Sequence, residues 1–139
     1  MHSLLNANLT EKTVLVRADF NVPLINGKIT NTFRIDSALE TIKFCINNRA
    51  KVILTSHLGR PQKKDSSSSL YPIFEYLKSK LNTRVYFSDD CISKNSFDQS
   101  KKMKSGEVHL LENLRYYIEE EKCDLNFSKK LSSHADIFI

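Results

Sequence analysis

The side chains best suited to chemistry follow an apolar run in the middle of the chain. Residues 52–55 are apolar or β-branched, and His57, Gly59 and Arg60 come directly after them, ahead of Pro61. Short apolar runs of this kind are typical of buried strands, and α/β proteins bind ligands just beyond the carboxyl ends of parallel strands. His57 and Arg60 can both donate hydrogen bonds to an anion, while Gly59 lets the backbone turn closely. Taken alone, the segment fits a ligand site or an ordinary polar loop equally well.

Two other apolar runs end in the same way. Asp19 and Asn21 follow residues 14–16, and Arg115 follows residues 108–111. If these runs are parallel strands, their carboxyl ends meet at one edge of a sheet. Arginine binds phosphate and carboxylate groups, whereas Asp and Asn bind hydroxyls, so this mixture suits a small phosphorylated ligand that also carries hydroxyls. The residues predicted to meet there are Asp19, Asn21, Arg34, His57, Arg60 and Arg115.

Ordinary structural roles are also open to these residues. The alternatives are an exposed strand-end charge at Arg17, a turn cap at Asp19, a pairing of Arg34 with Asp36 or Glu40, and a pairing of Arg115 with Glu119 or Glu120. Exposed charge pairs of this kind contribute little energy and are common on protein surfaces. The repetition of the pattern at three strand ends favours the ligand site.

The predicted elements alternate between strands and helices. Apolar positions in residues 34–48 recur at helical spacing, and Asn31 or Thr32 can cap that helix. Asn26-Gly27 between apolar residues predicts a hairpin turn. The other expected elements are strands at residues 13–17, 51–55, 84–87, 108–111 and 135–139, helices at residues 70–81, 92–104 and 124–133, and an exposed, mobile loop at residues 62–69. This order predicts an α/β fold, with a mostly parallel sheet and helices on both of its faces.

Composition argues against several classes of protein. The chain has 139 residues, a net charge of +5, three cysteines and three glycines. Its lysines are dispersed and are not interleaved with aromatic residues, which argues against nucleic-acid binding. No apolar run is long enough for a membrane span, and residues 1–12 lack the pattern of a secretory signal. The glycines cannot form a Gly-x-Gly-x-x-Gly or Walker A loop, and no cluster has metal-ligand spacing. The cysteines form no Cys-x-x-Cys pair, so we expect a reducing compartment and buried or half-buried thiols.

Three segments together resemble the phosphoglycerate kinase family. They are residues 14–23, 56–61 and 110–115, which read VLVRADFNVP, SHLGRP and LLENLR. The hairpin around Gly27 and the Arg34-Ile35 pair match as well, and the resemblance runs from about residue 12 to residue 139. The three signatures in this order are far more specific than any one of them alone.

The resemblance implies an enzyme that reversibly transfers phosphate between 1,3-bisphosphoglycerate and ADP, giving 3-phosphoglycerate and ATP. It also implies two Rossmann-like domains that close around their substrates by a hinge motion. Residues 1–139 would be an incomplete N-terminal domain that binds the phosphoglycerate, and Mg²⁺ with ADP or ATP would bind to a C-terminal domain outside this chain. We therefore expect this chain alone not to turn over. The parent would be a glycolytic, cytoplasmic monomer with no nucleic-acid or membrane partner.

The same resemblance implies a role for individual residues. Asp19 and Asn21 would bind the hydroxyl and carboxylate end of the glycerate, and Arg34 would stabilise the transferring phosphoryl group. The whole implied set is Asp19, Phe20, Asn21, Arg34, His57, Gly59, Arg60 and Arg115, with Arg34 also catalytic, His57, Arg60 and Arg115 on the phosphate and carboxylate, and no metal ligand. Phe33, where the family usually has a polar residue, and Ala18, where valine is more common, depart from the pattern without removing a charged group.

Two other functions stay open on the residues alone. One is a complete, non-catalytic module that binds a phosphorylated metabolite. A continuation of the family pattern beyond residue 139 would argue against this hypothesis. The other is a basic protein that binds nucleic acid. That protein would lose affinity steeply with salt and would be indifferent to Arg60→Ala.

Overall fold

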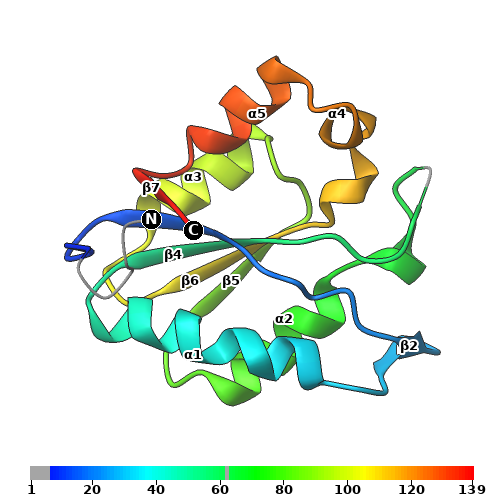
Figure 1. Cartoon of the computed structure of the whole chain (residues 1–139), viewed down its shortest axis with the longest axis horizontal. Coiled ribbons are helices and arrows are strands. Elements are labelled where there is room, and N and C mark those ends of the chain that lie inside the picture. Colours follow the sequence, from blue (N-terminus) through cyan, green and yellow to red (C-terminus); the bar gives the residue numbers. More distant parts are fainter. Residues whose placement is uncertain (1–6, 62) are drawn as a thin grey trace.

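Five parallel strands form the central sheet of the computed structural model, which describes residues 7–61 and 63–139 (Figure 1). The strands are β1 (Thr13–Arg17), β4 (Lys51–Thr55), β5 (Val85–Ser88), β6 (Val108–Leu111) and β7 (Ile137–Phe138). They lie in the order β5-β6-β4-β1-β7. The central strand β4 is buried at four of its five positions, which explains its continuous apolar sequence.

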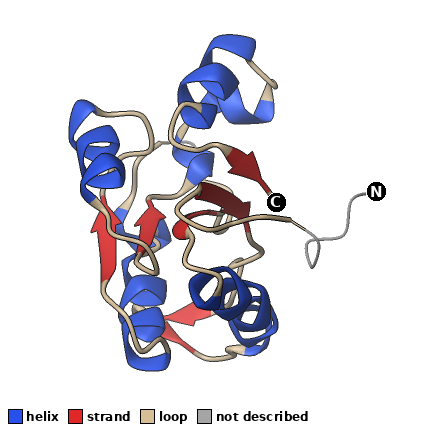
Figure 2. Cartoon of the chain, turned by 90° about the vertical axis from the view of Figure 1, so that its left-hand side faces the viewer, coloured by secondary structure: helices blue, strands red, loops and turns tan. Residues whose placement is uncertain are grey.

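Helices cover both faces of this sheet, which confirms the predicted α/β architecture (Figure 1, Figure 2). The helices are α1 (Phe33–Asn47), α2 (Tyr71–Lys80), α3 (Lys94–Lys102), α4 (Ile118–Glu121) and α5 (Leu125–Ser132). Helices α1 and α2 lie on one face, and α3, α4 and α5 lie on the other. Alternate residues of β4 point into two separate apolar cores: Val52 and Leu54 belong to the core under α1 and α2, whereas Ile53 belongs to the other.

The predicted hairpin is present as a small antiparallel pair, β2 (Leu24–Ile25) and β3 (Lys28–Ile29). Asn26 and Gly27 both have positive φ, at 50° and 74°. Two successive residues in this region give the turn whose twist matches antiparallel strands, and Asn and Gly are the residues that adopt it at least cost.

The structure differs from the sequence-based expectations in three local features. Residues 62–69 were expected to be an exposed, mobile loop, but the described part holds a short 3₁₀ turn, η2 (Ser66–Ser68), capped by the side chain of Asp65. Of the two predicted caps of α1, Asn31 accepts from the N–H of Phe33 at 2.9 Å, but Thr32 does not cap the helix with its side chain, because its hydroxyl donates to Asp36 at 2.7 Å. Cys45 and Cys91 are buried as expected, but Cys123 is exposed.

A chain of hydrogen bonds joins two buried histidines, His109 on β6 and His134 after α5. The His134 Nε2 atom lies 2.7 Å from the carbonyl oxygen of Cys91, which can only accept, so Nε2 carries the proton. The Ser100 hydroxyl therefore donates to His134 Nδ1 at 2.7 Å and accepts from His109 Nδ1 at 2.9 Å. The hydroxyl of Ser88 in turn donates to His109 Nε2 at 2.7 Å. Both rings are neutral in this arrangement, and both ring nitrogens of His109 are bonded to serine hydroxyls.

This buried pair predicts loss of stability in mild acid. Burial, and the neighbouring His134, lower the pKa of His109 from 6.5 to about 3, and burial also lowers the pKa of His134. Because both pKa values are lower in the folded chain, the unfolded chain takes up protons first, and stability falls as the pH drops below about 6.5. We expect the free energy of unfolding in urea to fall by about 2 kcal/mol per pH unit between pH 6 and pH 5.

His109→Gln is the matched variant for this measurement, since it removes one titrating group from the buried pair. It should reduce the slope by about one proton, or about 1.4 kcal/mol per pH unit. His57, whose pKa is also lowered, contributes in the same direction in both proteins. An unfolding free energy that is constant from pH 7 to pH 5 would show that the two histidines are not held neutral.

Candidate functional site

Three neighbouring strands deliver their polar loops to the same edge of the sheet. Arg17 at the end of β1 pairs with Thr55 at the end of β4, and Leu54 of β4 pairs with Leu110 of β6. The backbone N–H of Phe20 donates to the Ser56 hydroxyl at 2.9 Å, and the N–H of Leu114 donates to the Ser56 carbonyl at 2.9 Å. A single residue after β4 therefore ties together the loops after β1 and β6, as the parallel arrangement predicted.

The loop after β1 brings a carboxylate, an amide and a guanidinium into contact. Arg34, in the first turn of α1, donates from Nη1 to the carbonyl oxygen of Asn21 at 2.9 Å and lies 3.4 Å from Asp19 Oδ1. Asp19 Oδ1 also accepts from the N–H of Asn21 at 3.1 Å. Asp19 therefore caps this turn, as one of the alternatives predicted, and also lies beside Arg34. Arg34 pairs with neither Asp36 nor Glu40 in the described contacts; Asp36 instead accepts hydrogen bonds from Tyr76 and Thr32.

The loop after β4 is tied to the loop after β1 at Gly59. The N–H of Gly59 donates to Asn21 Oδ1 at 2.9 Å, and Gly59 has a φ of +62°. That backbone conformation costs little for glycine and considerably more for a residue with a Cβ atom. Arg60 follows directly, with an exposed side chain. The bonded glycine fixes the point from which this arginine extends.

Asn113 joins the remaining loops with one side chain that is fully buried. Its Oδ1 accepts from the N–H groups of Leu58, at 3.1 Å, and Arg115, at 3.0 Å. Its Nδ2 donates to the carbonyl oxygens of Leu58 and Ser68, both at 2.8 Å. All the hydrogen-bonding capacity of this amide is used on backbone groups of three separate segments, so its orientation is fixed.

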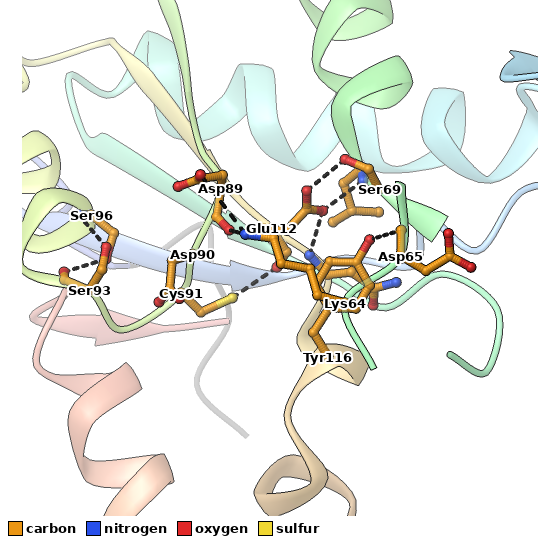
Figure 3. Close-up of polar contacts among 12 residues, drawn as sticks. Lys64, Asp65, Ser69, Asp89, Asp90, Cys91, Ser93, Ser96, Glu112 and Tyr116 are labelled. Atoms are coloured by element: carbon orange, nitrogen blue, oxygen red, sulfur yellow. Dashed lines mark hydrogen bonds and ion pairs between the residues drawn. The ribbon is translucent and has the colours of Figure 1, made fainter. Parts of the chain in front are cut away.

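The side chain of Glu112 holds the segment that leads into α2 by accepting hydrogen bonds from it (Figure 3). Its Oε1 accepts from the N–H groups of Leu70 and Asn113, both at 2.8 Å, and its Oε2 accepts from the Ser69 hydroxyl at 2.6 Å. Its carbonyl oxygen accepts from the thiol of Cys91 at 2.8 Å. Glu112 is only 3% exposed, and these donors replace the water that a buried carboxylate loses.

Arginines and a histidine face one another on the other side of these loops. Arg17 Nη2 lies 2.5 Å from Glu120 Oε1, and Arg115 Nε lies 3.9 Å from Glu120 Oε2. The pKa of His57 is lowered first by burial and then by the charges of Arg115 and Arg17, while Asp19 and Glu120 oppose this. His57 therefore lies within the field of both arginines, and each further anion that enters would favour its charged form.

The structure places most of the residues predicted from the sequence along one continuous edge. Asp19, Asn21, Arg34 and Gly59 are joined by direct contacts, and His57 lies in the field of Arg115. Phe20 differs: its side chain is fully buried in the core and its N–H is bonded to Ser56, so it supports the loop from below. Phe33 is 73% exposed, and its N–H donates to Asn31 Oδ1 at 2.9 Å.

The alternative pairing of Arg115 with Glu120 is present in the structure, at 3.9 Å. Three other residues of the edge had no predicted role: Ser56, Glu112 and Asn113. Ser56, Glu112 and Asn113 are polar side chains directly after buried strands, and that position was the available signal. Their partners are mainly backbone groups, which a sequence does not reveal. The alternative of an exposed strand-end charge holds for Arg17, which ends β1 with a side chain that is 55% exposed, and Arg17 also pairs with Glu120 beside Arg115.

Comparison with known proteins agrees with this geometry. The family model described as phosphoglycerate kinase matches residues 4–139. The chain belongs to the phosphoglycerate kinase family. Curated relatives include the phosphoglycerate kinases of Wolbachia pipientis wMel, 45% identical over 99% of this chain, and of Prochlorococcus marinus strain MIT 9515, 47% identical over 100% of it. The chain spans 34% and 35% of the lengths of these two relatives.

Solved phosphoglycerate kinase structures share the fold. The enzyme of Pyrococcus horikoshii OT3 matches 99% of this chain with a TM-score of 0.89 and 34% identity, covering 36% of that enzyme. The enzyme of Coxiella burnetii matches 97% of this chain with a TM-score of 0.83 and 37% identity, covering 33% of that enzyme. The family and its fold are therefore shown for this chain.

Residues 7–61 and 63–139 contain no group of three or more His, Cys, Asp or Glu side chains suited to a metal. Within the same described residues, no helix has both the length and the apolar character needed to cross a bilayer.

Proposed function

We propose that this chain binds the phosphoglycerate of a kinase that transfers phosphate between 1,3-bisphosphoglycerate and ADP. The observation that carries the proposal is the convergence of three strand-end loops into one edge that holds Asp19 and Asn21 next to arginines. Membership of the phosphoglycerate kinase family supports the choice of ligand. A glycolytic and cytoplasmic role for a monomeric parent belongs to the same proposal.

Each group has a chemical task in this proposal. Asp19 accepts a hydrogen bond from the glycerate hydroxyl, and the side-chain amide of Asn21 donates to the hydroxyl and carboxylate end. Arg60 and Arg115 bind the phosphate and carboxylate groups by charge-assisted hydrogen bonds, and His57 joins them when an anion raises its pKa. Arg34, which lies beside Asp19, stabilises charge on the phosphoryl group during transfer. Mg²⁺ with the nucleotide, held outside this chain, would supply the phosphate donor or acceptor.

Calorimetric titration with 3-phosphoglycerate tests the proposal on the 139-residue chain. Arg60→Ala should weaken binding by about tenfold or more, because it removes a charge-assisted contact to the phosphate or carboxylate. Lys63→Ala is the matched control, since it removes one positive charge from an exposed neighbouring position and should leave the affinity within about twofold. Equal losses from the two variants would indicate a general charge effect and would contradict the proposed site.

A further inference from the structure

Glu120 occupies the space between two arginines of the candidate site. Its Oε1 lies 2.5 Å from Arg17 Nη2 and its Oε2 lies 3.9 Å from Arg115 Nε. The side chain of Glu120 is only 10% exposed, whereas those of Arg17 and Arg115 are 55% and 28% exposed. A carboxylate at this position presents to the arginines the kind of oxygen atoms that a phosphate or carboxylate ligand would present.

The position of Glu120 follows from the local fold. Arg17 ends β1, and Arg115 lies in the 3₁₀ turn η3 (Leu114–Tyr116) after β6. The short helix α4 follows η3 within a few residues and returns Glu120 to the two guanidinium groups. All three side chains line one depression of about 390 Å³, whose other wall comes from α5. The carboxylate and an incoming anion therefore compete in the same small space.

We propose that Glu120 is an internal counter-ion: it holds Arg17 and Arg115 while the site is empty, and a ligand anion must displace it to engage these arginines. This proposal rests on the proposed function for the identity of the natural ligand. In this role Glu120 sets the affinity and the selectivity with which the site binds anions.

The charges give the expected direction of the effect. Without Glu120 the guanidinium group of Arg17 would lose its 2.5 Å carboxylate partner and would present its charge to an incoming anion beside Arg115. With Glu120 in place, the charge of Arg17 is compensated, and the carboxylate repels the ligand as well. Weakly held anions are then excluded, while a ligand with several anionic groups, which also contacts Arg60, gains enough to displace the carboxylate. Removing the charge of Glu120 should therefore tighten anion binding rather than weaken it.

Glu120→Gln is the decisive variant and Glu119→Gln is its matched control. Both changes remove one negative charge from adjacent residues of the same short helix, but the side chain of Glu119 is exposed. Calorimetric titration should show that Glu120→Gln binds 3-phosphoglycerate about three- to tenfold more tightly than the unmodified chain. The gain should be larger for inorganic phosphate, because that ligand has no second group with which to displace the carboxylate. Glu119→Gln should change either affinity by less than about twofold.

A second readout does not depend on the natural ligand. In the absence of any ligand, the Nε–Hε NMR signal of Arg17 should shift in Glu120→Gln and stay in place in Glu119→Gln. Adding inorganic phosphate to the unmodified chain should move the same signal toward its position in the phosphate-saturated Glu120→Gln variant. A signal that does not respond to phosphate would show that no anion displaces the carboxylate.

The outcomes separate this proposal from the proposed function. If Glu120→Gln binds both anions more weakly, Glu120 orients the arginines for the ligand and the counter-ion role is wrong. If Glu120→Gln binds phosphate more tightly while Arg60→Ala leaves the affinity for 3-phosphoglycerate unchanged, the counter-ion role stands and the phosphoglycerate assignment fails. If Arg60→Ala weakens 3-phosphoglycerate binding but Glu120→Gln and Glu119→Gln bind both anions equally, the phosphoglycerate site stands and the counter-ion role is overturned.

Discussion

Replacement of Asn113 by leucine is expected to lower the free energy of unfolding by about 3 kcal/mol and to abolish measurable binding of 3-phosphoglycerate. Leucine has nearly the same volume but no polar atom, so the backbone groups of Leu58, Ser68 and Arg115 lose their partner in the interior. Each buried group left without a hydrogen bond costs about 1–3 kcal/mol, less where the loop can open to water. The loops that carry Arg60 and Arg115 would then no longer be held in a fixed position relative to each other.

Asn126→Leu is the matched control for this change, because Asn126 is exposed on α5. Urea unfolding followed by circular dichroism should give a loss below about 0.5 kcal/mol for the control. Titration with 3-phosphoglycerate is then run on both variants at a temperature at which both are folded. If folded Asn113→Leu binds the ligand as tightly as the control, Asn113 supports only the fold and not the position of the site.

Two substitutions of Glu112 should differ strongly in their effect. Glu112→Ala removes the acceptor of the Leu70 and Asn113 N–H groups and of the Ser69 hydroxyl, and it leaves a cavity, so we expect a loss of about 3–4 kcal/mol. Glu112→Gln keeps one oxygen for the two N–H groups, and its new amide donor can face the Ser69 hydroxyl, which can accept instead. The expected loss for glutamine is about 1 kcal/mol.

Urea unfolding measures both Glu112 variants against the corresponding pair at Glu40, an exposed position on α1. The pair at Glu40 should differ little from each other or from the unmodified chain. The difference between alanine and glutamine at position 112 therefore isolates the acceptor role of this side chain. Equal losses for both Glu112 variants would mean that the negative charge, rather than hydrogen-bond geometry, stabilises the loops.

The fold could be predicted from the sequence because its strands are buried on both faces. Residues 52–55 are apolar or β-branched without interruption, and alternation with helical segments leaves a parallel sheet as the natural arrangement. The short helix α4 was missed, since its four residues include three glutamates and carry no apolar periodicity. Its position depends on the contacts of Glu120 with the arginines, which join residues far apart in the sequence.

The candidate site was predictable to the level of strand ends but not of contacts. Parallel pairing alone brings Asp19, His57 and Arg115 to one edge, whatever their side chains do. The sequence could not show that Asn113 and Glu112 bind backbone groups, because any polar residue after a strand has the same local signature. Phe20 illustrates the converse: it stands within a polar segment, yet packing of the loop turns its ring into the core.

The central claim is that three strand-end loops of this chain form one phosphoglycerate site. The most direct measurement is an NMR titration of the ¹⁵N-labelled chain with 3-phosphoglycerate, following the backbone amide signals. We expect saturable shifts concentrated in residues 18–21, 57–60 and 113–115, with the same dissociation constant for all three segments. Shifts confined to the lysine-rich positions at residues 63–64, 101–102 and 129–130, or a folded chain with no saturable shift, would contradict the claim.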